Sequence, residues 1–229
     1  MIKKNRESAE RKLSEARSLQ PYSTVERDAV IENVEKRSRF TGRCLPVENE
    51  ADALMALATI RKEHWNATHN CYAYRLRSGE ARFSDDGEPA GTAGMPMMEA
   101  LTKIGVTNVL VVVTRYFGGI LLGAGGLVRA YSKAATDAVR ASGIVRMLPC
   151  VCCRVVCAYP QWNSVRILCE KYGRIETTAF SENVGCDVWV RNEACESFLT
   201  AVREQTDGRV IPERIREACF PFPETEENQ

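Results

Sequence analysis

The amino-acid sequence predicts an α+β protein of two domains, and two observations lead to this class. Segments with helical spacing of apolar residues alternate with short segments of strand character along most of the 229 residues. After Gly143 a complete strand–helix–strand–strand–helix–strand order begins, which is the ferredoxin-like pattern. We therefore expect a first domain over residues 21–146 and a ferredoxin-like domain over residues 147–220.

The two ends of the chain are charged and fall outside both predicted domains. Residues 1–20 have the composition of a charged helical extension, which Pro21 would end. Residues 221–229 form an acidic tail that is rich in proline at its start, and we expect it to be disordered.

The first half of the first domain predicts strands on both sides of one helix. Residues 31–47 indicate a strand pair or one long bent strand. Apolar residues recur at helical spacing over 51–64, and Asn49 suits the N-cap of that helix. Residues 69–76 alternate in polarity and residues 80–86 follow a Ser-Gly turn signal, so a hairpin is expected.

The second half of that domain predicts two helices with a buried strand between them. Residues 95–104 indicate a helix that Gly105 stops. The valine- and leucine-rich segment 108–114 is typical of a buried strand. Residues 127–141 have helical spacing again, and Gly143 closes that helix.

The second domain repeats strands and helices in a new order. The six elements, from strand to strand in the ferredoxin-like order, are expected at 148–159, 161–172, 175–180, 186–191, 193–206 and 209–215.

Charge is distributed unevenly between the two halves. The net charge of the whole chain is only +1, which predicts no general affinity for polyanions. Residues 150–229 carry nine Lys and Arg against thirteen Asp and Glu, which leaves 22 against 17, or +5, for residues 1–149. A basic surface is therefore expected in the first domain.

The sequence predicts a cytoplasmic protein with no membrane partner. Its N-terminal segment is charged throughout and lacks the apolar core of a secretory signal. No apolar run approaches the membrane-spanning length of about 20 residues. Ten cysteines without an export signal indicate a reducing compartment, free thiols and no disulfide.

A glycine-rich stretch over residues 114–134, "TRYFGGILLGAGGLVRAYSKA", is the main candidate site. Free N–H groups at a helix start and arginine side chains both suit phosphate, whereas glycines alone can serve close packing of a strand and a helix. Arg129 and Lys133, at i and i+4, would share one helix face. We predict a phosphate-facing surface, with the candidate residues Arg115, Tyr116, Gly118, Gly119, Gly123, Gly125, Gly126, Arg129 and Lys133.

An acidic loop, "FSDDGEPAGTAGMPM", is the second candidate. Asp85, Asp86 and Glu88, with Thr92 close behind, could offer oxygen ligands to a divalent cation. Asp and Gly are also common turn and cap residues, and this interpretation is favoured, so no metal is expected. Since both loops join elements of one small domain, we expect the three acids to lie beside the glycine-rich stretch.

His69 and Cys71 form a possible Cys–His dyad, because they lie at i and i+2 on one face of a strand. No third residue that would orient them is visible, and cysteine is also a common small core residue. The dyad therefore remains an alternative to simple core packing.

The cysteine-rich segment "CVCCRVVC" resembles a metal site only at first sight. On a strand, Cys150 and Cys152 would face one way while Cys153 and Cys157 face the other. A zinc site needs converging ligands, so we expect buried free thiols instead.

Three segments together resemble the IMPACT/YigZ family: "HNCYAYR", "FSDDGEPAGTAG" and "VVVTRYFGGILLGAGGLVRAYSKA". The resemblance extends from about Tyr22 onward. It implies a first domain of the ribosomal-protein-like fold with a left-handed βαβ crossover, similar to domain IV of elongation factor G and to GHMP kinases. It also implies that the ferredoxin-like domain is similar to domain V of that elongation factor.

The family resemblance implies a function close to translation. Eukaryotic members, which share only the first domain, regulate translation under starvation, and this suggests translation regulation in a stress response. We expect RNA, a ribosome or a translation-related protein as partner, with no cofactor. An enzyme acting on a nucleotide or phosphorylated substrate, or a pure protein-interaction module, remains an alternative.

One position departs from the family pattern. Many members carry Lys in the GTAG-x-P segment where this chain has Met95. The spacing of the glycines also matches neither GxxxxGKS/T nor GxGxxG. We therefore expect the phosphate-facing surface to take an RNA backbone rather than a mononucleotide.

Overall fold

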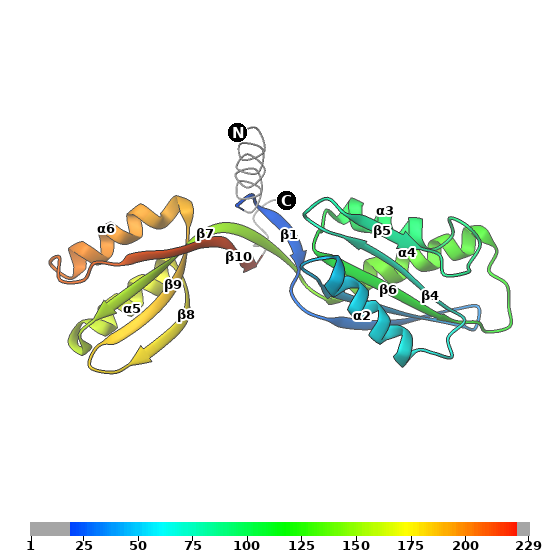
Figure 1. Ribbon diagram of the computed structural model, residues 1–229, viewed down its shortest axis with the longest axis horizontal. Helices are drawn as coiled ribbons and strands as arrows, with labels where there is room; N and C mark the ends of the chain where they lie inside the picture. The colour runs from blue at the N-terminus through cyan, green and yellow to red at the C-terminus, as the bar shows by residue number, and fades with distance from the viewer. Residues whose placement is uncertain (1–18, 224–229) are drawn as a thin grey trace, which may run out of the picture. The chain divides into compact units, whose positions relative to one another are not determined.

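The computed structural model describes residues 19–223, which divide into two compact units (Figure 1). We call residues 22–146 the first unit and residues 147–222 the second unit. The predicted helical extension lies outside the described residues except for Leu19 and Gln20. In the described part of the chain, no helix has both the length and the apolar character needed to cross a membrane.

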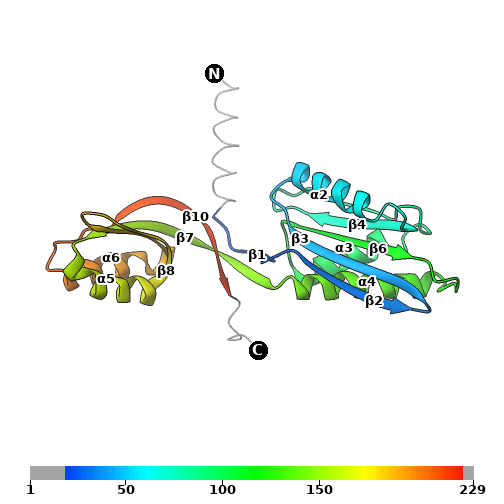
Figure 2. The same ribbon diagram turned by 90° about the horizontal axis from the view of Figure 1, so that it is seen from below.

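The first unit contains a five-stranded antiparallel sheet in the order β2–β3–β6–β4–β5. Figure 2 shows α2 on one face of this sheet and α3 and α4 on the other. The elements are β1 (Tyr22–Val25), β2 (Ala29–Glu35), β3 (Ser38–Pro46), α2 (Glu50–Glu63), β4 (His69–Arg75), β5 (Ala81–Ser84), α3 (Gly94–Ile104), β6 (Val109–Tyr116) and α4 (Ala124–Ala141).

Strand β6 lies in the middle of the sheet and is buried on both faces, as its composition predicts. Its odd-numbered valines pack with α3 and α4, whereas Leu110 and Val112 pack with α2. Since successive side chains of a strand point to opposite faces, Arg115 continues the first set and Tyr116 the second. The alternation therefore places the candidate residues Arg115 and Tyr116 on opposite faces of the sheet.

The second unit has the predicted βαββαβ order, and its strands pair in the order β10–β7–β9–β8. One face of the sheet packs on α5 and α6. The elements are β7 (Ile144–Cys157), α5 (Tyr159–Tyr172), β8 (Gly173–Phe180), β9 (Val184–Arg191), a 3-10 turn (Asn192–Ala194), α6 (Cys195–Gln205) and β10 (Glu213–Pro223).

The cysteines of β7 divide between the two faces of its sheet, as predicted from strand alternation. Cys153 and Cys157 belong to the core under α5 and α6, whereas Cys150 and Cys152 pack with Trp189 on the other face. Nine of the ten cysteines are buried, and Cys219 is half-buried. Their opposite facing follows from the period of two along a strand.

Two strands of the second unit have boundaries that differ clearly from the prediction. Strand β7 begins at Ile144, so one strand carries the chain from the first unit into the second. Strand β10 covers Glu213–Pro223 rather than 209–215, so residues 221–223 belong to a strand and not to a tail. The physical reason for the longer β10 is aromatic packing, because Phe220 stacks on Trp189 with ring centroids 4.9 Å apart.

Candidate functional site

The glycine-rich stretch joins β6 to α4 and packs against the β2–β3 turn. At Gly118 a Cβ atom would lie 2.1 Å from both the carbonyl carbon and the oxygen of Arg37, so only glycine fits. The N–H of Gly118 also donates to Ser38 Oγ at 3.2 Å. Gly118 therefore serves close packing of the backbone, the alternative to phosphate binding that glycines also allow.

Helix α4 begins earlier than predicted, at Ala124 instead of Leu127. Gly123 is its N-cap with φ of +72°, and no side chain caps this end of the helix. Gly125 and Gly126 therefore lie in the first turn of the helix and not in the loop. The N–H groups of Ala124 and Gly125 have no hydrogen-bond partner within the described residues. Such a helix start attracts negative charge.

The β2–β3 turn places two basic residues in unfavourable backbone conformations. Glu35 pairs with Ser38, so Lys36 and Arg37 form a two-residue turn. Their φ angles are +45° and +65°, a region that costs an L-residue about 1–2 kcal/mol and normally holds Asn or Gly. Neither residue is among the predicted site residues, although a basic pair between two strand-like segments was a usable signal.

A hollow of about 260 Å³ lies between this turn and the start of α4, and we call it the basic hollow. Three cations contribute to it, together with one carboxylate. The side chain of Arg129 has no hydrogen bond or ion pair among residues 19–223, whereas Lys133 contacts Asp137 at 2.6 Å. The lining residues are Glu35, Lys36, Leu122, Gly126, Arg129, Ala130 and Lys133.

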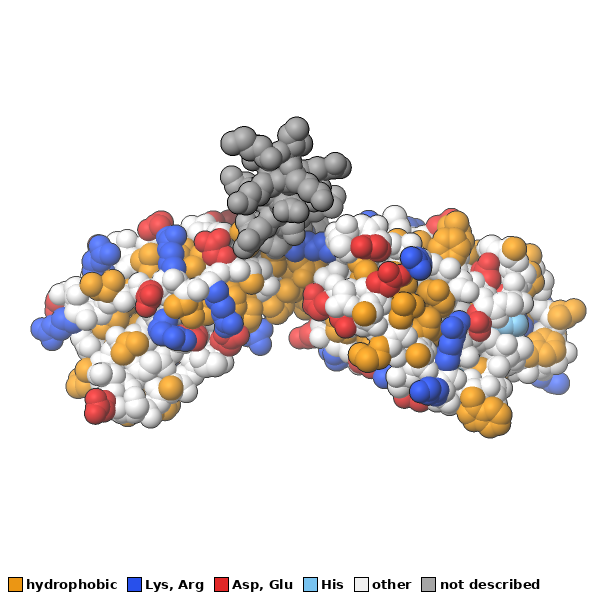
Figure 3. Space-filling model, viewed as in Figure 1, with side chains coloured by type: hydrophobic (Ala, Val, Ile, Leu, Met, Phe, Trp, Pro, Cys, Tyr) orange, Lys and Arg blue, Asp and Glu red, His pale blue; other side chains and the backbone are white. Residues whose placement is uncertain are grey.

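Neither basic nor acidic side chains dominate the visible face of the first unit (Figure 3). Figure 3 shows acidic and basic side chains interspersed on the visible face of the first unit. A second shallow hollow along α4 adds Arg140 to Arg129 and Lys133, but it also includes Asp137. The electrostatic case for an anion site is therefore local and depends on the basic hollow.

Arg115, predicted to face phosphate, is instead buried and paired. Only 5% of the residue is exposed, and its Nη1 donates to Glu88 Oε1 at 2.7 Å. Glu88 also accepts a hydrogen bond from Tyr131 Oη at 2.7 Å, and Arg115 Nη2 donates to Ser38 Oγ at 3.3 Å. The guanidinium charge is thus neutralised inside the unit, and the Nε of Arg115 has no hydrogen-bond partner among residues 19–223.

Tyr116 does not join Arg115, because it lies on the opposite face of the sheet. Its hydroxyl contacts His64 Nδ1 at 2.8 Å, and the guanidinium of Arg39 lies 4.4 Å from its ring centre. Tyr116 and Arg115, both predicted to be phosphate-facing residues, therefore lie on opposite faces of the sheet. Strand alternation was the signal that could have predicted this.

A pocket of about 360 Å³ lies between the glycine-rich stretch and the acidic loop, and we call it the apolar pocket. Its floor contains the Glu88–Arg115 pair and its walls are mostly apolar. The lining residues are Thr68, His69, Gly87, Glu88, Pro89, Arg115, Phe117, Leu121, Leu122, Gly123, Ala124 and Leu127. Of the three loop acids expected beside the glycine-rich stretch, only Glu88 lines this pocket.

Asp85 acts as a cap for α3. Its carboxylate accepts hydrogen bonds from the N–H groups of Gly91, Ala93 and Gly94 at 2.8, 3.0 and 2.8 Å. Burial raises the pKa of Asp85, but these three donors outweigh it and hold the pKa below its ordinary value. The turn and cap interpretation therefore describes this residue.

Asp86 and Thr92 also serve the loop itself. Asp86 accepts from the N–H of Asn70 at 2.7 Å and pairs with Arg61 at 2.9 Å. Thr92 is buried, and its hydroxyl donates to the carbonyl oxygen of Pro89 at 2.7 Å. Their oxygens are thus committed to contacts within the unit.

His69 and Cys71 do not bond each other. Each contacts a backbone carbonyl of the acidic loop: His69 Nδ1 lies 2.8 Å from the oxygen of Asp86, and Cys71 Sγ lies 2.9 Å from that of Asp85. Burial raises the pKa of the Cys71 thiol to about 12, so the thiol stays protonated at neutral pH. The possible Cys–His dyad is therefore not formed.

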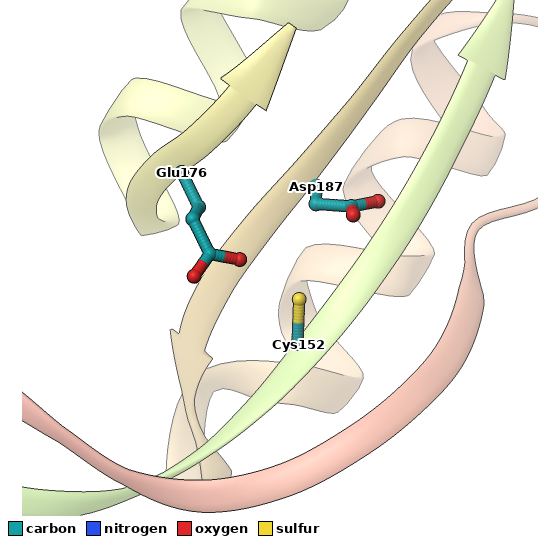
Figure 4. Close-up of side chains that lie close together, drawn as sticks. All are labelled: Cys152, Glu176 and Asp187. Atoms are coloured by element: carbon teal, nitrogen blue, oxygen red, sulfur yellow. The ribbon is translucent and has the colours of Figure 1, made fainter.

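Another group of potential ligands lies in the second unit, where Cys152, Glu176 and Asp187 converge (Figure 4). Each carboxylate already has an arginine partner. Arg154 donates twice to Asp187, both at 2.8 Å, and Arg216 pairs with Glu176. Two guanidinium groups beside these three side chains oppose the approach of a further cation.

The chain is similar to known proteins over most of its length. The model of the Impact N-terminal domain matches residues 36–139, and that of a domain of unknown function, DUF1949, matches residues 155–209. The IMPACT family member YvyE of Bacillus subtilis is 37% identical over 194 residues, covering 83% of this chain and 89% of YvyE. YigZ of Escherichia coli is 39% identical over 143 residues, covering 61% and 70%.

Two further similarities extend the comparison. Protein IMPACT of Oryctolagus cuniculus is 38% identical over 96 residues, which cover 39% of this chain and 30% of that protein. The crystal structure of a protein described only as hypothetical is 30% identical, with a TM-score of 0.55 over 86% of this chain and 98% of that one.

Proposed function

This chain belongs to the IMPACT family, and we propose that it is a translation-linked regulatory protein whose first unit binds RNA or a ribosomal surface. The link to translation comes from the eukaryotic members that the sequence resembles, and Protein IMPACT matches this chain over 96 residues. In this proposal the first unit corresponds to domain IV of elongation factor G, and the second unit to domain V. The βαββαβ order of the second unit supports that correspondence.

The basic hollow is the observation that carries the RNA-binding part of the proposal. Lys36, Arg129 and Lys133 approach it from a strand turn and a helix, and the uncapped start of α4 lies beside them. Arg129 has no partner among the described residues, so its guanidinium is available to a phosphate. Positive side chains with free helix N–H groups match a phosphate backbone.

The test is sedimentation of the purified chain with ribosomes across a salt series, followed by identification of crosslinked RNA. The double variant Arg129→Ala/Lys133→Ala should bind more weakly. On single-stranded RNA its salt dependence should flatten by about 0.7 in logarithmic slope for each phosphate that the variant no longer neutralises. Arg129 should contribute more than Lys133, because Lys133 already pairs with Asp137.

A matched control removes two positive charges from the second unit. Arg166→Ala/Lys171→Ala changes the net charge equally, on helix α5, and should leave binding nearly unchanged. An Arg129→Ala/Lys133→Ala protein that folds and binds with unchanged affinity and slope contradicts the proposal. Salt-insensitive binding to a protein partner would instead favour an interaction module, and a nucleotide that raises the melting temperature would favour an enzyme.

A further inference from the structure

We propose that the apolar pocket receives one unstacked guanine base of a single-stranded RNA whose backbone lies along the basic hollow. This inference rests on the proposed function and names the base that the first unit selects. Leu122 lines both the pocket and the hollow, and the lining of the pocket includes Gly123 and Ala124, where α4 begins. A nucleotide whose phosphate lies at this helix start therefore has its base within reach of the pocket.

The size and walls of the apolar pocket suit a flat aromatic group. Its volume of about 360 Å³ falls in the range of small-molecule sites, about 300–1,000 Å³. Phe117 and Leu121, two of its walls, are 46% and 81% exposed, although both are large apolar side chains. Proteins commonly bind unstacked RNA bases against such aromatic and apolar surfaces.

Glu88 supplies a hydrogen-bond acceptor at the floor of the pocket. The Glu88 side chain is 3% exposed, and its partners Arg115 and Tyr131 both bind Oε1. No hydrogen bond to Oε2 occurs among the described residues. Glu88 lines the pocket, so Oε2 is the carboxylate oxygen left to accept a hydrogen bond from a ligand there.

His69 supplies a second acceptor beside the first. Its Nδ1 faces the carbonyl oxygen of Asp86, which can only accept, so Nδ1 carries the proton. In the neutral imidazole Nε2 is then an acceptor, and it lies 3.9 Å from Glu88 Oε1. Since both residues line the pocket, Nε2 of His69 and the carboxylate of Glu88 are two neighbouring acceptor groups for a ligand.

Two neighbouring acceptors discriminate among the four RNA bases. On its Watson–Crick edge only guanine has two adjacent donors, N1–H and the N2 amino group. Adenine and cytosine would turn a ring-nitrogen acceptor toward one of the protein acceptors, and uracil would turn a carbonyl oxygen. A buried acceptor left facing an acceptor is costly, so the pocket selects guanine.

The experiment compares fluorescence-labelled oligouridylates of equal length that carry guanine, hypoxanthine or adenine at one central position. Because charge is equal, differences in affinity report the base alone. Guanine should bind about tenfold or more tightly than adenine, as for a good bidentate base contact. Hypoxanthine, which lacks the N2 amino group, should lie between them.

Two variants test the pocket without changing Glu88, whose removal would leave Arg115 buried without its partner. His69→Phe should abolish the preference for guanine over adenine, because it removes the Nε2 acceptor from the pocket. Leu121→Ala, at an exposed position, should weaken guanine binding severalfold. Met55→Ala in α2 is the matched control, because Met55 is also apolar and 68% exposed.

The outcomes separate this inference from the proposed function. Arg129→Ala/Lys133→Ala should weaken all three oligonucleotides equally and keep their ratio. RNA binding without base preference overturns the guanine pocket and leaves the proposed function standing. If no RNA binds but free guanosine, unlike adenosine, shifts the His69 resonances, the pocket is supported and the RNA-binding function is overturned. No response to either ligand overturns both.

Discussion

Gly118 and Gly125 belong to the same glycine-rich stretch, yet the structure predicts opposite results for the same substitution. In Gly118→Ala the new methyl group would lie 2.1 Å from the carbonyl carbon and oxygen of Arg37 and 2.5 Å from the nitrogen of Ser38. These are backbone atoms, which cannot rotate away as a side chain can. Either the β2–β3 turn or the loop after β6 must move.

The magnitude follows from what that movement breaks. Overpacking costs about 1–3 kcal/mol, and loss of the hydrogen bond from the Gly118 N–H to Ser38 Oγ adds about 1 kcal/mol. We expect Gly118→Ala to lower the free energy of unfolding of the first unit by about 3 kcal/mol. In Gly125→Ala the methyl group meets only Arg129 Nη1, at 3.6 Å, so the change should stabilise α4 by about 0.5–1 kcal/mol.

Hydrogen exchange measured by mass spectrometry resolves the two effects, because it follows each unit separately in a chain that need not unfold in one step. Gly118→Ala should speed exchange in β2, β3 and β6 of the first unit and leave the second unit unchanged. Gly125→Ala should slow exchange in α4. A Gly118→Ala protein within about 0.5 kcal/mol of the parent, the usual range for a surface substitution, would refute the packing argument.

Three further predictions follow from the buried and capped groups. Glu88→Gln should lower the unfolding free energy of the first unit by about 3–5 kcal/mol, because it leaves Arg115 buried without its partner; a loss under about 1 kcal/mol in urea unfolding would contradict this. Since the folded-state pKa of Asp85 is lowered, its stabilisation is present above the ordinary Asp value of about 3.9 and is lost as pH falls through the folded pKa. Asp85→Asn should therefore weaken the dependence of the unfolding free energy on pH in the acid range. An unchanged dependence would be evidence against the role of Asp85 as the cap of α3. Iodoacetamide should alkylate Cys219 before Cys71, because Cys219 is half-buried whereas the Cys71 thiol is buried and has a pKa of about 12. Peptide mapping that finds Cys71 alkylated first would contradict the burial of Cys71.

Much of the fold could be predicted because its signals are local. The 3.6-residue spacing of α2, α3 and α4 and the valine-rich character of β6 are properties of short segments, and the structure confirms all four elements. The opposite facing of Cys150–Cys152 and Cys153–Cys157 also follows from strand period alone. Such patterns need no knowledge of which strands pair.

The role of Arg115 could not be predicted, because it depends on strand register. Its position after a buried strand indicated an exposed cation at the edge of the core. Its partner Glu88 lies 27 residues earlier, in the acidic loop. The pairing of β4 with β6 puts His69 opposite Arg115, and His69 contacts the Asp86 carbonyl of that loop. Sequence spacing contains no such register, so an ion pair and a free phosphate ligand are indistinguishable at that level.

The strained β2–β3 turn connects the packing of the glycine-rich stretch with its proposed function. Asn and Gly at residues 36 and 37 would adopt the observed positive φ angles with less strain, but the chain has Lys36 and Arg37 there. Antiparallel pairing of β2 with β3 and the close approach of Gly118 hold the turn in place. Strain of this kind persists where the surroundings over-determine it, and it concentrates at functional sites. Because Lys36 lines the basic hollow opposite Arg129, the strained turn supplies a positive charge where the proposed RNA backbone needs one. Packing alone explains Gly118, but it gives no reason for a basic pair in a turn that favours Asn and Gly.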